Sequence, residues 1–468
     1  MAKVTFSSLD VALLVIVFTS FLLLGLSTKL KSTNSLSLIA AGRKLTLPFF
    51  VATLVTTWYG GILGIGESFD WIGIATWLIF GVPYYLFGLA YAFFMARKVR
   101  DVEQISLPER FSRVNDRTTG VICALLILLI ALPGFHIFML ATLIENILET
   151  SLFVSAVIGA LVGTVYLYRG GLLADARANI VSFLLMYVGF IVALVYAVTH
   201  LGSPSEVISS LPDSHRSWDG KQEGGIWFVI SWYMIGAWTF VDPGFHQRVT
   251  STNDSSLSFK GVLWSVFFWV IFDFLSIGTA MYAYASLGPG HGANLFPLFG
   301  EQVLPSGIKG IFFAGMLGVI LSAMAGYTLV AGSTIGRDIL ARSFRIQDEQ
   351  RVVLFTRIGI VAATVLAIAL AMYIPSVVQI WFTTGGIVIP GLLFPTIFAF
   401  RKPLPPFTTK LCMLMGSGSA LAWYLLIRYE YVAGDLSLIL PIYVGLVGAI
   451  IALVIGAFKP KGVIADER

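Results

Sequence analysis

Runs of twenty or more apolar residues recur along this chain of 468 residues and limit its fold more than any other feature. A helix of about twenty apolar residues is long enough to cross the hydrocarbon core of a bilayer. Hydrophobic residues make up 57% of the chain and charged residues only 12%, which is about half the charged share of a soluble protein. The sequence therefore predicts an all-α polytopic membrane protein rather than a soluble protein with one large core.

The apolar runs divide into thirteen predicted transmembrane helices. Their approximate limits are 8–28, 46–66, 72–96, 118–147, 151–168, 173–199, 224–246, 260–287, 308–336, 352–373, 376–400, 409–428 and 436–458. Alternate threading leaves all but five of the 30 lysines and arginines on one side of the membrane. The positive-inside rule then places the N-terminus outside and the C-terminus in the cytoplasm. We expect a multi-pass protein of the plasma (inner) membrane, in contact with lipid.

Several other classes of protein are disfavoured. The two cysteines, Cys123 and Cys412, lie inside apolar runs and are too few for a disulfide framework or a zinc site. The hydrophilic loops are too short to form a soluble domain, and no nucleotide-binding or metalloprotease motif is present, so we do not expect an enzyme. No cofactor, nucleic acid or obligatory protein partner is indicated. The first apolar run is too long for a signal peptide and is expected to remain as a membrane anchor.

Four of the predicted helices contain residues that weaken or break a helix. The stretch TTWYGGILGIG (56–66) has four glycines, and further interruptions are predicted at Leu132-Pro133-Gly134, at Val241-Asp242-Pro243-Gly244 and at Thr384-Gly385-Gly386. Interrupted backbone is tolerated at membrane depth only against protein or a water-filled cavity. If the first span is extra, the breaks at 56–66 and 241–244 fall in core helices 1 and 6. Those are corresponding positions of two inverted five-helix repeats, which is typical of secondary transporters.

Six stretches, in order, resemble one known family. They are AGRKLTLPFFVATLVTTWYGGILGIGESFDWIG (41–73), ISLPERF (105–111), YRGGLLADARANIVSF (168–183), VDPGFHQR (241–248), AGMLGVILSAMAGYTLVAGSTIGRDIL (314–340) and WFTTGGIVIPGLLFPTIF (381–398). Together they resemble the sodium/solute symporter family, which contains proline, pantothenate and sialic acid carriers. The resemblance covers residues 41 to about 400.

The resemblance implies a LeuT-type fold, a 5+5 inverted repeat with one extra N-terminal and two extra C-terminal helices. The units would be 1–30, the repeats 41–200 and 224–400, the C-terminal pair 409–458 and a cytoplasmic tail at 459–468. The implied function is a secondary active transporter, a symporter that imports a small organic solute. A channel is disfavoured because the two breaks suit an occluded site better. A transceptor, which binds a solute without moving it, remains an alternative.

In this family the solute lies between the broken helices 1 and 6. The resemblance implies that residues 56–61 are unwound, and that an aromatic side chain covers the solute at the position of Trp238. A single buried histidine is more often structural, but His136 follows the break in helix 3, which faces the solute in this fold. Sugar carriers hold their substrate with a polar side chain where this chain has a glycine, so a sugar is disfavoured. The predicted solute-binding residues are Trp58, Tyr59, Gly60, Gly61, His136 and Trp238.

The family's main sodium site can be carried over only in part. Its backbone and hydroxyl ligands match Leu54, Thr57, Val319 and Ser322. Two further positions have changed, because Asn179 stands where the family has an aspartate and Ala323 where it has a second serine. Sodium prefers oxygen ligands and benefits from a carboxylate nearby. We therefore expect one weak sodium site, with proton-coupled or uncoupled transport as the alternatives.

Ionisable residues inside predicted spans are functional candidates because their burial in a membrane is costly. Asp273, in the apolar stretch WVIFDFLSIG, is a candidate proton carrier or ion ligand, and a structural hydrogen bond to a neighbouring helix is the alternative. Three further pairs are expected at helix ends, either lining a vestibule or forming interfacial and gating contacts. They are Glu67 with Asp70, Asp175 with Arg177, and Asp242 with Arg248.

The predicted orientation can be tested by labelling the two ends of the chain. We expect a cysteine introduced by Ala2→Cys to react with a membrane-impermeant maleimide on intact cells. A cysteine introduced by Ala465→Cys should react only after the membrane is opened. Labelling of both ends from the same side would contradict an odd number of spans.

Overall fold

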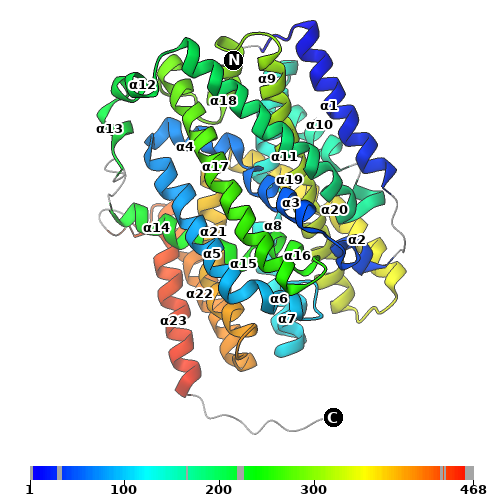
Figure 1. Cartoon of the computed structure of the whole chain (residues 1–468). Helices are drawn as coiled ribbons and strands as arrows, with labels where there is room; N and C mark the ends of the chain where they lie inside the picture. The colour runs from blue at the N-terminus through cyan, green and yellow to red at the C-terminus, as the bar shows by residue number, and fades with distance from the viewer. Residues whose placement is uncertain are drawn as a thin grey trace.

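The computed structural model describes residues 4–28, 34–164, 167–218, 226–432, 436 and 439–458. Apart from one isolated bridge between Leu45 and Thr252, this described part consists of helices and their connections (Figure 1). The all-α prediction is therefore confirmed. The predicted tail at 459–468 lies outside the described residues.

Helical segments occupy the positions of all the predicted spans. The principal ones are α1 (Ser8–Ser27), α3 (Leu47–Tyr59), α4 (Ile62–Ile72), α5 (Val82–Tyr91) with the π-helical turns η2 (Trp77–Gly81) and η3 (Ala92–Ala96), α8 (Arg117–Ala131), α9 (Gly134–Leu148), α10 (Leu152–Thr164), α11 (Leu167–His200), α14 (Ile226–Gly236), α15 (Trp238–Val241), α16 (Pro243–Thr250), α17 (Ser255–Leu287), α19 (Ile308–Ser333) with the π-helical turn η5 (Thr334–Ala341), α20 (Glu349–Tyr373), α21 (Val377–Ala399), α22 (Pro406–Arg428) and α23 (Pro441–Phe458). Shorter helices connect them, namely α2 (Ser35–Ala40), α6 (Arg97–Asp101), α7 (Leu107–Val114), α12 (Pro204–Ser210), α13 (Asp213–Arg216) and α18 (Leu295–Gln302).

The number of membrane spans is a separate matter from the number of helices. By length and composition, nine segments of the described chain can cross a membrane, and the bent pair α3–α4 makes a tenth. The other predicted spans correspond to α1 and α10, whose described apolar parts are shorter, and to the broken series α14–α16. The count of thirteen stays a prediction.

The broken helices lie at the centre of the bundle. α3 contacts α11, α17 and α19, and α16 contacts both α3 and α19. At the sides, α1 packs on α11 and α19, whereas α22 and α23 pack on α21 at the opposite side (Figure 1). Because neighbouring helices surround the breaks, the freed backbone groups are kept away from lipid, as a membrane fold requires.

One predicted interruption is wrong. α21 runs without a break through Thr384, Gly385 and Gly386. Glycine lowers helix stability by only about 1 kcal/mol relative to alanine, so two glycines do not by themselves break a helix. The structure gives Gly385 a different use, because a Cβ atom there would lie 2.9 Å from the ring of Trp238. The break before Gly134 is confirmed, since α8 ends at Ala131 and α9 begins at Gly134.

The contact between α19 and α20 depends on glycine and yields a stability prediction. A Cβ atom at Gly359 would lie 2.3 Å from the carbonyl oxygen of Gly332, whereas a Cβ atom at Gly418 on α22 would meet nothing within 4 Å. We expect Gly359→Ala to lower the free energy of unfolding by about 1–3 kcal/mol, the usual cost of overpacking. Gly418→Ala should leave it unchanged or slightly higher. Thermal unfolding in detergent measures both, and equal midpoints would contradict the tight helix contact.

Candidate functional site

The first break is a two-residue hinge at Gly60 and Gly61. α3 ends at Tyr59, α4 begins at Ile62, and the two helices meet at a bend of 43°. The predicted unwinding of 56–61 is therefore too long, because residues 56–59 remain helical. Both glycines have negative φ angles, of −55° and −91°, which any residue can adopt. The bend in the backbone therefore does not itself require glycine.

What these glycines provide is the absence of a side chain. A Cβ atom at Gly60 would lie 2.0 Å from the Cβ atom of Ala323 on α19. A Cβ atom at Gly61 would lie 2.1 Å from the indole ring of Trp381 on α21. The hinge is thus pressed against two helices of the second half of the chain, and larger residues cannot occupy it without displacing them.

The second break contains the short helix α15 and the residue Asp242. One Asp242 carboxylate oxygen accepts a hydrogen bond from the backbone N–H of Phe245 (2.6 Å) and so caps the N-terminus of α16. The other oxygen accepts hydrogen bonds from the indole N–H of Trp238 (2.8 Å) and the hydroxyl of Tyr327 (2.6 Å). Asp242 is only 5% exposed. The second break therefore carries a buried carboxylate held by three donors.

A cavity lies between the two breaks and encloses about 590 Å³ of atom-free space, open solvent included. Its lining residues are Thr57, Trp58, Tyr59, Gly61, Ile65, Phe80, Tyr84, Phe135, Trp238, Asp242, Tyr327 and Trp381. The structure therefore brings four of the six predicted solute-binding residues to one cavity, namely Trp58, Tyr59, Gly61 and Trp238.

The other two predicted solute residues lie behind the cavity wall. Gly60 faces α19, and His136 is fully buried against Phe135 and Tyr327, with ring centroids 3.8 Å and 5.1 Å away. Neither ring nitrogen of His136 has a hydrogen-bond partner within the described chain. Its edge approaches the hinge, since a Cβ atom at Gly60 would lie 3.0 Å from Nε2.

The carboxylate of the cavity is not among the predicted solute-binding residues. The sequence places Asp242 at a helix end with Arg248, whereas the structure turns its side chain toward Trp238 and Tyr327. A signal was present: Asp242 stands directly before Pro243 at a helix break, and four residues after an aromatic residue already predicted to contact solute. Tyr84, Tyr327 and the other aromatic wall residues carried no such signal, because 14% of the chain is aromatic.

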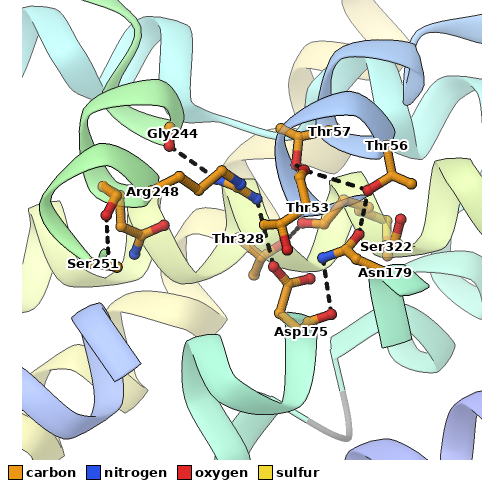
Figure 2. A network of polar contacts seen from close by, with 12 residues as sticks. Thr53, Thr56, Thr57, Asp175, Asn179, Gly244, Arg248, Ser251, Ser322 and Thr328 are labelled. Carbon is orange, nitrogen blue, oxygen red and sulfur yellow. Dashed lines mark hydrogen bonds and ion pairs between the residues drawn. The ribbon is translucent and has the colours of Figure 1, made fainter. Parts of the chain in front are cut away.

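The predicted cation residues lie on two helices in contact, α3 and α19, close to α11 (Figure 2). The hydroxyl of Thr57 donates to the carbonyl of Thr53 (2.7 Å), and the hydroxyl of Ser322 donates to the carbonyl of Val319 (3.1 Å). Both hydroxyls are therefore turned to their own helices. Leu54 and Val319 are buried, and their role as carbonyl ligands stays a prediction.

The two changed positions join the same region. Asn179 on α11 accepts a hydrogen bond from the hydroxyl of Thr56 (2.6 Å) and donates one to the carbonyl of Asp175 (2.8 Å), as Figure 2 shows. The methyl group of Ala323 contacts the hinge at Gly60 instead of presenting a hydroxyl. A neutral amide thus connects α3 and α11 at the position where the family has a carboxylate.

The predicted pairing of Asp175 with Arg177 is wrong. Asp175 forms an ion pair with Arg248 at 3.5 Å, and both side chains are fully buried (Figure 2). Arg177 instead donates to the hydroxyl of Thr28 at 3.1 Å. The side chains of Asp175 and Arg248 are both fully buried in the protein, and their ion pair connects α11 to α16. Arg248 is the ion-pair partner of Asp175, and the described residues contain no ion pair between Arg248 and Asp242.

The remaining carboxylates also have defined partners. Asp273 accepts hydrogen bonds from the hydroxyls of Tyr59 (2.8 Å) on α3 and Tyr85 on α5, which are hydrogen bonds to neighbouring helices of the kind that the alternative predicted. Glu67 accepts hydrogen bonds from the hydroxyl of Ser376 and the N–H of Val377 (3.0 Å), at the N-terminus of α21. Asp70 accepts N–H bonds from the loop before α18, from Gly290 (3.1 Å) and Gly292 (2.7 Å).

Comparisons with known proteins identify the family and the fold of this chain. A model described as the Sodium:solute symporter family matches residues 39–394. The human High affinity choline transporter 1 is 24% identical over 204 residues, which are 40% of this chain and 34% of that protein. The match thus spans about a third of that relative's length.

Two solved structures show the fold. A Na⁺-coupled sialic acid symporter in a substrate-bound outward-open state has a TM-score of 0.74 at 15% identity, covering 97% of both chains. Mhp1, a nucleobase-cation-symport-1 family transporter, has a TM-score of 0.50 at 16% identity, covering 91% of this chain and 96% of its own. At such low identity these structures establish the architecture alone, which is the expected LeuT-type fold.

The tight hinge leads to a prediction about the cavity. Because Gly61 touches Trp381, the larger side chain in Gly61→Leu must enter the cavity or displace the indole ring. We expect this variant to reach the membrane but to lose solute uptake. Gly418→Leu, which adds the same side chain at an exposed position of α22, is the control. Normal uptake by Gly61→Leu would mean that the solute binds elsewhere.

Proposed function

This chain belongs to the sodium:solute symporter family, and from that premise we propose that it imports a small organic cation, driven by one sodium ion. The family and its structural neighbours are transporters and symporters, so the chain is a secondary transporter and not an enzyme. The solute class and the ion stoichiometry belong to the proposal, as does a location in the plasma membrane with the N-terminus outside.

The observation that carries the cationic solute is the uncompensated charge of Asp242 in an aromatic cavity. A buried carboxylate is costly unless a positive charge is near. Within the described chain Asp242 has only neutral donors, and the nearby Arg248 pairs with Asp175. An ammonium group of a bound solute would supply the missing charge, whereas an anionic solute would be repelled.

The cavity walls support the same conclusion. The ring centroids of Trp58 and Tyr84 lie 4.1 Å apart, and both residues line the cavity together with Trp238 and Trp381. Aromatic faces attract cations by about 0.5–2 kcal/mol each, and tryptophan is the strongest of them. The similarity to a choline transporter fits this chemistry, because choline carries a quaternary ammonium group.

The sodium part of the proposal rests on what remains at the predicted cation site. Thr57, Ser322 and buried carbonyls of α3 and α19 offer oxygen ligands, and sodium requires oxygen ligands. A hydroxyl that donates its hydrogen to a carbonyl keeps its oxygen lone pairs, so Ser322 and Thr57 can serve as ligands in the orientation that the structure shows. With an amide at Asn179 and a methyl group at Ala323, no second site assisted by a carboxylate is expected.

The solute class can be tested with a matched pair of ligands. We expect choline to raise the thermal unfolding midpoint of the purified protein, and its neutral carbon analogue 3,3-dimethyl-1-butanol to leave it unchanged. Asp242→Asn should weaken choline binding about tenfold or more, because a hydrogen-bonded charge contributes about 1.5–3 kcal/mol. Glu206→Gln, which removes one negative charge from the exposed helix α12, is the control.

Equal binding of the charged and neutral ligands would contradict the cationic solute. Counterflow of labelled solute in liposomes then separates transport from binding alone. A protein that binds choline but shows no counterflow would be a transceptor.

The ion coupling makes a separate prediction. We expect Ser322→Ala to raise the sodium concentration that gives half-maximal uptake, and Asn179→Asp combined with Ala323→Ser to lower it. Ser333→Ala is a matched control, since Ser333 lies on the same helix and also donates to a carbonyl three residues earlier (2.9 Å). A Hill coefficient for sodium clearly above one in the unmodified protein would overturn the single site.

A further inference from the structure

The solute and sodium sites leave one buried charge of the membrane core without a role. Asp273, near the middle of α17, is 2% exposed and lies outside the cavity lining. In contrast to Asp175, it forms no ion pair with any lysine or arginine of the described chain. A charge in such surroundings is expensive, and binding of a proton is the simplest way to remove it.

The hydrogen bonds around Asp273 can accommodate both the charged and the protonated carboxyl group. The Tyr59 hydroxyl oxygen lies 2.8 Å from Asp273 Oδ1 and 2.6 Å from the carbonyl oxygen of Trp269. A phenol has one hydrogen, so it can donate to only one of these two acceptors at a time. The hydroxyl of Tyr85 donates to the other carboxylate oxygen, Oδ2. The Tyr59 hydroxyl is therefore a donor with two alternative acceptors.

We propose that Asp273 is a proton-binding site that takes up one proton from the outer side and releases it to the cytoplasm in each transport cycle. This inference rests on the proposed transport function. On proton uptake an O–H bond forms at Asp273 Oδ1 and the group becomes neutral. The new hydroxyl donates to the Tyr59 oxygen, and Tyr59 turns its own hydrogen to the carbonyl of Trp269. No other covalent bond changes, and release reverses these steps.

The position of Tyr59 connects the proton to the moving part of the molecule. Tyr59 is the last residue of α3, directly before the hinge at Gly60 and Gly61, and its ring lines the cavity. Its hydroxyl points the other way, to α17. Protonation of Asp273 therefore replaces the bond from Tyr59 to a charged acceptor by a neutral one of opposite direction, and it turns the Tyr59 hydrogen to the carbonyl of Trp269, next to the hinge.

The side chains around Asp273 include no second carboxylate, histidine or cysteine among the described contacts. The titratable residues that face Asp273 are tyrosines, namely Tyr59 on α3, Tyr85 on α5 and Tyr187 on α11. Tyrosine ordinarily loses its proton near pH 10. Tyr187 donates to the carbonyl of Phe268 at 2.6 Å and not to Asp273.

A proton fits this site better than a second sodium ion. Sodium needs several oxygen atoms that are free to act as acceptors. Around Asp273 the hydroxyls of Tyr59 and Tyr85 direct their hydrogens at the carboxylate oxygens, so a cation bound at the carboxylate would face those hydrogens.

The test uses the full chain in liposomes with equal sodium on both sides and an inward pH gradient. With one proton per solute, a gradient of one pH unit should support up to about tenfold accumulation of labelled choline. Asp273→Asn should lose this accumulation but keep counterflow, because it leaves the cavity intact. Accumulation by Asp273→Asn equal to that of the unmodified protein would overturn the proton site. So would counterflow by the unmodified protein without any response to the pH gradient.

Absence of choline counterflow in the unmodified protein would instead overturn the proposed transport function, and this inference with it. A second pair of variants covers the case in which Asp273→Asn does not fold. Tyr59→Phe keeps the carboxylate but removes a donor that stabilises its charged form, so the external pH of half-maximal uptake should rise. Tyr187→Phe removes a neighbouring hydroxyl that is bonded elsewhere and should not shift that pH. Equal pH profiles for the two variants would contradict the role of Asp273.

Discussion

The need to satisfy every backbone N–H and C=O group in lipid governs this structure. Helices meet that need by themselves, and a break is tolerated only where protein surrounds it. Both central breaks therefore lie inside the bundle, with α3 enclosed by α11, α17 and α19. The cavity forms between the hinge at Gly60–Gly61 and the turn at Asp242, where the backbone is free of helical constraint. The position of the site therefore follows from the inability of lipid to form hydrogen bonds with unpaired backbone groups.

The same low-polarity interior makes each buried carboxylate informative. Asp175 has a cation of its own in Arg248, and that ion pair joins α11 to α16. Asp242 has three neutral donors and faces the cavity, so its countercharge can come with a solute. Asp273 has tyrosine hydroxyls and no cavity, so its countercharge can be a proton. With the two proposals, three aspartates of similar burial have three different ways of compensating charge, of which the ion pair of Asp175 is the one that the structure contains.

The sequence predicted much of the fold but less of the site. Composition and apolar runs indicated the helices, and the positions of glycine and proline identified the hinge at residues 60–61 and the break at Asp242. Pro243 and Gly244 nevertheless begin α16, and the gap at Ala237 before α15 was not predicted. The same reasoning predicted a break at 384–386 that does not exist. Glycine permits a turn, but it also permits close packing, and the two uses look alike in a sequence. Gly385 is needed because the ring of Trp238 lies against α21, which is a contact between distant segments.

By itself, the sequence determined the membrane class, the helix positions, the family and four residues of the cavity wall, because apolar runs and breaks are local properties of the chain. Only the tertiary structure decided which polar groups meet. Asp175 pairs with Arg248 rather than with Arg177, and Asp273 meets Tyr59 from the other half of the chain. Such pairs depend on how each helix is rotated against its neighbours. That rotation is set by packing among several helices at once, and no single stretch of sequence contains it.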